Sequence, residues 1–152
     1  MKKERILEGV LIIAILAATF GFIVTSSQSL KDTLFEEKDY NGNIIAISII
    51  ESSLVQKSVN LNGPSKDLKI LKNKIEEMEI KKTGKENTIE SINPIYILTI
   101  EAENNTGKTD KAVLTLTSNG DIYVSGSEEV YKEKGNTCSL YRTVKKLIEK
   151  ED

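Results

Sequence analysis

The side chains that could carry out chemistry in this chain are carboxylates, hydroxyls, lysines and one thiol, because the sequence contains no histidine. Histidine is the most frequent general base and the common partner of a serine or cysteine nucleophile. It is also a frequent zinc ligand. Its absence leaves carboxylate pairs, serine-lysine pairs and oxygen-only metal sites as the kinds of active site that the composition allows.

One short motif has the spacing of a metal site. Asp39, Asn41 and Asn43 alternate as the oxygen ligands at the start of a calcium loop do. Ile44 occupies position six, where such a loop has glycine, and Ile50 occupies position twelve, where it has glutamate. We therefore interpret the motif as a polar turn before a strand, and we expect neither a metal nor any other cofactor.

Cys138 is the single cysteine, so the chain cannot form an internal disulfide. A catalytic thiol needs a lowered pKa, and Arg142, one helical turn later, is the only local positive group placed to lower the pKa of Cys138. We predict that Cys138 is a half-buried residue at the start of a helix. A disulfide to a partner protein is the alternative.

Two serines have lysines near them in the sequence. Ser65 precedes Lys66, and Ser139 is followed by Lys145 and Lys146. Each serine also suits the N-cap of a helix, and each lysine suits a solvated helix face. We therefore expect no catalytic residues and no enzymatic activity, with an uncharacterised enzyme as one of the alternatives.

Charged residues of both signs alternate along the chain, with 21 Lys and Arg against 23 Asp and Glu and a net charge of −2. This mixture forms no basic patch, so we expect no nucleic-acid partner. Glu101 and Glu103 share one face of a predicted strand and can pair with Lys108 or Lys111 across a hairpin. Such pairs are typical of the solvated face of a sheet.

The spacing of apolar residues after residue 43 predicts a small α+β domain. Residues 44–50 form a β-branched run that predicts a buried strand, and residues 54–61 predict a second, more exposed strand. Ser65 suits the N-cap of an amphipathic helix that extends to Met78. A meander of three strands and a closing helix follow, with strands at 96–102, 112–116 and 122–124 and the helix at 140–148. We expect an antiparallel sheet of four or five strands with one or two helices packed on one face.

Tyrosines are the best candidates for a recognition surface, because their rings combine apolar area with a polar tip. Tyr96 is expected in the core. Tyr123 and Tyr131, near the last hairpin and the loop after it, are the candidates for exposure. We therefore name Tyr123 and Tyr131 as possible partner contacts.

The amino-terminal part of the chain has the composition of a membrane segment. Residues 10–24 contain no charged residue and follow a basic start. This apolar run by itself is short for a bilayer, and a window counted from Ile6, which includes Glu8, is about long enough to span one. The basic residues predict a cytoplasmic amino terminus. We expect a tail at 1–5, a transmembrane signal anchor at 6–25, a polar neck at 26–43 and an extracytoplasmic domain at 44–152. The alternative is a signal peptide cleaved near Ser26, which would release a secreted domain.

The order of elements carries a resemblance to known proteins. The strand at 44–50, the helix at 65–78, the strands Asn-Pro-Ile-Tyr-Ile-Leu-Thr-Ile, Ala-Val-Leu-Thr-Leu and Gly-Asp-Ile-Tyr-Val, and the closing helix cover residues 44–149. This pattern resembles small uncharacterised extracytoplasmic domains of Gram-positive membrane proteins and lipoproteins, although the lipid-modified cysteine is missing. The helix and three strands are also similar to the peptidase-propeptide and YpeB domain, which implies inhibition or regulation of a peptidase.

These observations together predict a single-pass, membrane-anchored binding or regulatory module of the bacterial cell envelope, without catalysis. Its partners would be the membrane, through residues 6–25, and a protein of the envelope. An inhibitor or regulator of an envelope peptidase is one alternative. A filament subunit is another, because Leu7 and Glu8 before the apolar run are similar to the start of a type IV pilin, although Lys3 stands where a pilin has glycine.

Overall fold

The computed structural model describes residues 27–35, 43–53, 56–85 and 94–150. The predicted tail at 1–5 and the predicted anchor at 6–25 lie outside these residues. Within the described ranges, none of the helices combines the length and the apolar character needed to cross a membrane.

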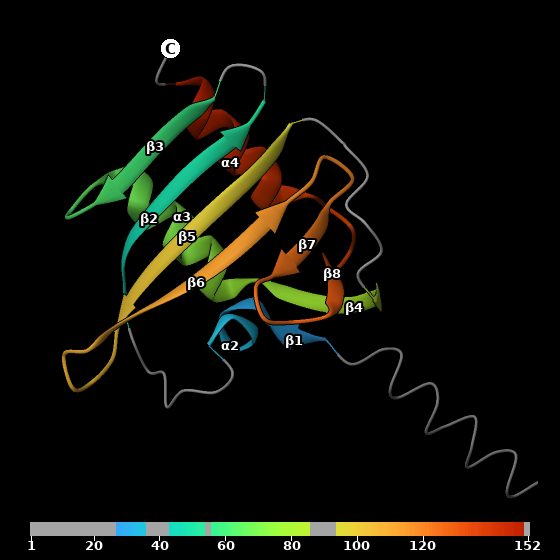
Figure 1. The fold of residues 1–152 in the computed structure, drawn as a ribbon, viewed down its shortest axis with the longest axis horizontal. Coiled ribbons are helices and arrows are strands. Elements are labelled where there is room, and N and C mark those ends of the chain that lie inside the picture. The colour runs from blue at the N-terminus through green and yellow to red at the C-terminus, as the bar shows by residue number, and fades with distance from the viewer. Residues whose placement is uncertain (1–26, 36–42, 54–55, 86–93, 151–152) are drawn as a thin grey trace, which may run out of the picture.

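Eight described strands form one antiparallel sheet in the order β1-β4-β8-β7-β6-β5-β2-β3, and α3 and α4 lie together on one face of it (Figure 1). The strands are β1 Gln28–Ser29, β2 Asn43–Ser52, β3 Lys57–Asn62, β4 Glu79–Lys85, β5 Ile95–Glu103, β6 Thr109–Leu116, β7 Asp121–Val124 and β8 Glu129–Glu133. The helices are α2 Leu30–Leu34, α3 Lys66–Glu77 and α4 Ser139–Glu149. The structure confirms the α+β class and the antiparallel sheet.

The predicted meander is confirmed as β5, β6 and β7. Leu98 of β5 pairs with Leu114 of β6, and Leu114 pairs with Val124 of β7. All three side chains are buried against the helices. Their neighbours along each strand point to the opposite face, because successive side chains of a strand alternate between faces.

Helix α3 begins and ends as the sequence predicts. The hydroxyl oxygen of Ser65 accepts a hydrogen bond from the backbone N–H of Leu68 at 3.0 Å, which satisfies a free donor of the first turn. Leu71 and Ile75 are fully buried on one side of the helix. Met78 has extended backbone angles, so the helix ends there and the chain enters β4.

The predicted sheet of four or five strands is too small, because β1, β4 and β8 were missed. The segment 79–85 is rich in lysine and reads as a polar connection, yet Ile80 is fully buried and pairs with Glu133 of β8. In β8 only two adjacent residues are apolar, so no alternation marks it as a strand. Short strands of this kind depend on pairing with distant segments rather than on their own pattern.

Residues 28–35, expected in a polar neck, belong to the domain. The strand β1 pairs with β4, and Leu30 of α2 is fully buried in the core. The backbone N–H of Leu30 also donates to the carbonyl oxygen of Met78 at 2.9 Å. The domain therefore begins before the expected residue 44. The strand at Gln28–Ser29 also contradicts a single helix running past Leu30, which a filament subunit would need.

Candidate functional site

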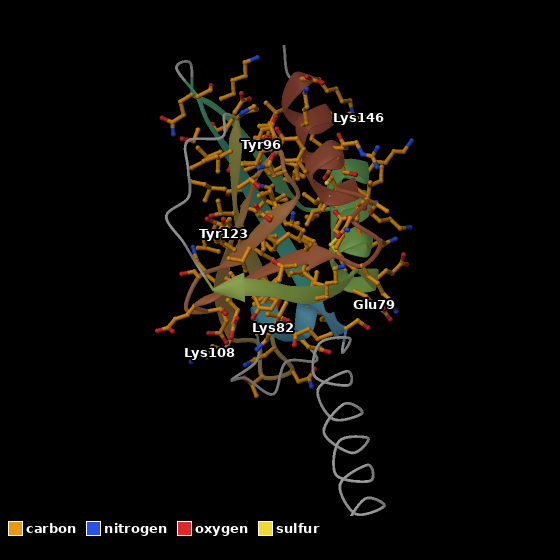
Figure 2. All side chains as sticks on the ribbon, turned by 90° about the vertical axis from the view of Figure 1, so that its right-hand side faces the viewer. Glu79, Lys82, Tyr96, Lys108, Tyr123 and Lys146 are labelled. Atoms are coloured by element: carbon orange, nitrogen blue, oxygen red, sulfur yellow. The ribbon has the colours of Figure 1, made fainter. Side chains whose placement is uncertain are left out.

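The sheet face opposite α3 and α4 carries a row of side chains in register across five neighbouring strands. The row consists of Ile50, Ile97, Thr115, Tyr123 and Val130, each paired with the next. Figure 2 shows Tyr123 on the side of the sheet away from the helices and Lys146 of α4 on the helix side. We call this set the outer row.

Most of the outer row retains contact with solvent. Ile50, Ile97, Thr115 and Tyr123 are half-buried, whereas Val130 is only 8% exposed. No described helix packs over this face (Figure 1). The row therefore forms an apolar band with one aromatic ring on the open side of the sheet.

Ion pairs border the outer row on both sides. Lys111 and Glu101 form a pair at 2.6 Å, as the sequence predicts, and Lys132 and Asp121 form a pair at 3.2 Å. These residues lie on the same face as the outer row, at an even number of positions along their strands from its members. An apolar centre with a charged border is the usual anatomy of a surface that binds another protein.

The expectation that Tyr131 is exposed is wrong. Tyr131 is 2% exposed and pairs with Ile122, whose side chain is also in the core. Its hydroxyl group shares a hydrogen bond with the hydroxyl group of Ser127 at 3.0 Å. The sequence placed Tyr131 in a loop, but it lies in β8 with its ring directed inward, so it cannot touch a partner in this structure.

Tyr96, expected in the core, is 2% exposed. Its ring lies 5.0 Å from that of Tyr141, between their centroids, and the hydroxyl group of Tyr141 donates to the carbonyl oxygen of Pro94 at 3.3 Å. Burial, together with the neighbouring Tyr141, raises the pKa of Tyr96 well above its usual range. These two rings therefore pack the core and do not form a recognition surface.

A buried carboxylate that the sequence did not single out caps helix α4. Glu133 is 4% exposed, and its oxygens accept hydrogen bonds from the backbone N–H groups of Ser139 at 2.8 Å and Leu140 at 2.5 Å. The hydroxyl groups of Thr137 and Ser139 also donate to it. Burial by itself raises the pKa of Glu133, but these hydrogen bonds outweigh burial and hold the pKa below its usual value.

The sequence offers Ser139 as the N-cap of α4, and this expectation is wrong. The N-cap residue is Cys138, in a left-handed conformation with φ of 49°, and its side chain makes no cap hydrogen bond. The carboxylate of Glu133, instead of the side chain of Cys138, accepts hydrogen bonds from the backbone N–H groups of the first turn. The prediction of a half-buried Cys138 at a helix start is confirmed.

The described contacts of Cys138 and Arg142 are with the main chain. Its sulfur lies 3.9 Å from the carbonyl oxygen of Asn136, and Arg142 donates to the carbonyl oxygen of Thr137 at 2.6 Å. Gly120 approaches Cys138 so closely that a Cβ atom at position 120 would lie 2.4 Å from the sulfur. The close approach indicates a packing role for this cysteine.

The serine-lysine pairs are not assembled. Ser65 caps α3, and Ser139 donates to Glu133. For the possible calcium loop, Asp39 and Asn41 lie outside the described residues, and the side-chain oxygen of Asn43 accepts a hydrogen bond from Lys72. Among the residues that the structure describes, no three acidic or cysteine side chains converge as metal ligands would.

Comparisons with known protein families, with curated proteins and with solved structures find no match.

Proposed function

We propose that this chain is a single-pass, membrane-anchored binding or regulatory module of the bacterial cell envelope, without catalytic activity. Residues 6–25 are the anchor, and the domain that begins near Ser27 faces outward. The module recognises a protein of the envelope, and its contact surface is the outer row. Tyr123 lies within that surface.

The observation that carries this proposal is the continuity of the outer row. Its members stay in register across β2, β5, β6, β7 and β8, whereas the solvated face of an antiparallel sheet usually alternates polar residues with the buried ones. Two isoleucines and a tyrosine in one band that none of the described helices covers favour contact with another protein. Tyrosine is enriched at such contacts because burying its ring costs little side-chain entropy.

The anchor is supported by composition. Residues 10–24 are uncharged, and Lys2, Lys3 and Arg5 precede them. A basic flank of this kind orients the following domain outward. The resemblance to extracytoplasmic domains of Gram-positive membrane proteins agrees with the same address.

The contacts of the candidate nucleophiles support the proposed absence of catalysis. Ser65 and Ser139 hold helix starts, and Cys138 packs against Gly120. A nucleophile needs an adjacent base that takes its proton. Glu133 is adjacent to Ser139, but its oxygens are already bonded to backbone N–H groups within a closed cap.

Photo-crosslinking in intact cells tests the contact surface. A photoreactive phenylalanine replaces Tyr123 in one variant of the full-length chain and Lys146 in the control variant, because these two positions lie on opposite sides of the molecule (Figure 2). We expect a discrete crosslinked envelope protein from position 123 alone, and loss of its co-purification in Tyr123→Lys. Equal products from both positions, or none from position 123, would contradict the proposal.

The membrane address has a separate test. Protease treatment of intact cells should degrade the domain after residue 26, and washing membranes with alkaline carbonate should leave the full-length chain in the membrane fraction. A chain that is soluble, untrimmed and protected from protease would show that the address is wrong.

A further inference from the structure

The start of β2, the turn after β3 and the first two turns of α3 line a groove. Its volume is about 680 Å³, which lies within the range of sites that bind ligands in proteins. Ile44, Ile45 and Leu68 form its apolar floor. Ile44 and Leu68 are themselves buried in the core, so the floor is firmly held.

Three lysines form the rim of this groove, and none is neutralised by an acidic residue in the described part of the chain. Lys66 and Lys69 are exposed on α3, and Lys72, one turn further, donates to the side-chain oxygen of Asn43, which is uncharged. Asp67, the nearest acidic residue in the sequence, pairs instead with Lys150 at 2.8 Å. The groove is therefore apolar below and positively charged above.

The main chain beside the groove is open to an added strand. The pairing of β2 with β3 stops at Ala46 and Asn62, so residues 43–45 of β2 have no strand on that side within the described ranges. β3 is also the last strand of the sheet. β3 carries one lysine, Lys57, which stands opposite Glu51 at the end of the strand away from the groove. Nearer the groove, the exposed side chains Ser58, Asn60 and Asn62 are small and uncharged, so they do not prevent another strand from pairing.

The opposite edge of the sheet is protected. β4 carries Lys81 and Lys82 and has a bulge between Lys82 and Gly84, and its first residues are covered by β1. Lysines and bulges are the usual means of preventing strand addition. Among the described strands, the β3 side alone combines an edge that is open to pairing near the groove with a hollow whose charge is opposite to that of an acidic ligand.

We propose that this groove binds an extended segment of a partner protein in which apolar and acidic residues alternate. The apolar side chains of the segment contact Ile44, Ile45 and Leu68, and its carboxylates pair with Lys66 and Lys69. Alternation is required because successive side chains of a strand point to opposite sides. This surface is distinct from the outer row, and it does not depend on the proposed function.

A direct binding measurement tests this proposal. The full-length chain is purified in a non-ionic detergent, and a fluorescein-labelled peptide of alternating valine and glutamate is titrated with it while fluorescence anisotropy is recorded. We expect saturable binding that weakens at least about fivefold when the salt concentration rises from about 0.05 to about 0.5 M, because salt screens exposed charges. A peptide of alternating valine and glutamine should bind at least about tenfold more weakly.

Charge reversal locates the site. Lys66→Glu/Lys69→Glu should weaken binding of the valine-glutamate peptide by at least about tenfold. Lys82→Glu/Lys134→Glu is the matched control, because both lysines are exposed and lie in or next to β4, near the edge of the sheet opposite to β3. The affinity of this control should change less than about twofold. If the first variant does not fold, Lys66→Gln/Lys69→Gln replaces it with an expected loss of at least about threefold.

Three results would overturn the proposal. The first is the absence of saturable binding of the valine-glutamate peptide. The second is equal affinity for the valine-glutamine peptide, which would show that the lysines do not select charge. The third is an equal effect of the groove variant and its control, which would place the binding elsewhere on the chain.

Discussion

Glu133 is a buried side chain that caps helix α4 from another element of the fold. Helix α4 has no side-chain cap from its own N-cap residue, and Glu133 reaches it from the end of β8. An ionised carboxylate at a helix start also interacts favourably with the helix dipole. The hydrogen bonds of Glu133 connect the end of β8 to the first turn of α4, although Glu133 lies 6 residues before Ser139 in the sequence.

Glu133→Gln should lower the free energy of unfolding by about 2–3 kcal/mol at neutral pH, because it removes a charge that accepts several hydrogen bonds. Urea unfolding of the full-length chain in detergent, followed by circular dichroism, measures the loss. Glu128→Gln is the control, since Glu128 is exposed on the same hairpin, and it should change stability by less than about 0.5 kcal/mol.

The effect of Glu133 should depend on pH in one direction. The pKa of Glu133 is lower in the folded state than the ordinary value of 4.5, so its ionised form stabilises the fold. That contribution is complete above pH 4.5 and is lost as the pH falls through the lower folded pKa. The gap between the wild-type chain and Glu133→Gln should therefore narrow on acidification below pH 4.5. An unchanged gap would show that folding does not shift the pKa of Glu133, and a gap that widens on acidification would show that folding raises that pKa.

Among the elements, the hairpin between β6 and β7 needs a glycine at position 120 for two reasons. Gly120 has φ of +80°, a left-handed conformation that costs little only for glycine, and it also lies against Cys138. The hairpin therefore supports both the outer row through Tyr123 and the start of α4. A substitution at this position affects two layers of the domain at once.

Gly120→Ala should destabilise the domain by about 1–3 kcal/mol, because it adds backbone strain and a clash with the sulfur of Cys138. Gly84→Ala is the matched control, since a Cβ atom at position 84 meets nothing within 4 Å and its φ is not positive. The loss in Gly120→Ala/Cys138→Ala should be smaller than the sum of the two single losses. Additive losses would show that the contact with Cys138 contributes nothing.

At the scale of the whole molecule, the segment 28–35 ties the amino-terminal part of the chain to the far edge of the sheet. β1 pairs with β4, and Lys31 of α2 lies 3.6 Å from Glu76 of α3, between charged atoms. If residues 6–25 are an anchor, little free chain separates the membrane from the domain. The proposed module is then held close to the membrane and has limited freedom to rotate about its anchor.

Leu30→Ala should lower the free energy of unfolding by about 2–4 kcal/mol, because Leu30 is fully buried and its removal leaves a cavity. Ile70→Ala, at a residue that is 44% exposed, should cost less than about 1 kcal/mol. The comparison tests whether α2 is part of the folded core. Equal small losses in urea unfolding would return residues 28–35 to the polar neck that the sequence predicted.

Local sequence patterns were enough to predict the helices and strands in which apolar residues recur at a regular spacing. The repeat of Leu68, Leu71 and Ile75 predicted α3, the alternation through Leu98 and Leu114 predicted the meander, and Ser65 predicted where α3 begins. Each of these patterns follows from the geometry of a single helix or strand. They also predicted that the helices cover one face of the sheet that contains the meander.

Tertiary structure alone decided the position of β4, the inward direction of Tyr131 and the capping by Glu133. β4 joins the sheet between β1 and β8, segments that are distant along the chain from one another, and its lysine-rich residues have no apolar period. The face that Tyr131 occupies depends on the register of β8 with β7, because a shift of one residue exchanges the two faces. Register and long-range pairing arise from packing among all the elements together, so no local window of sequence contains them.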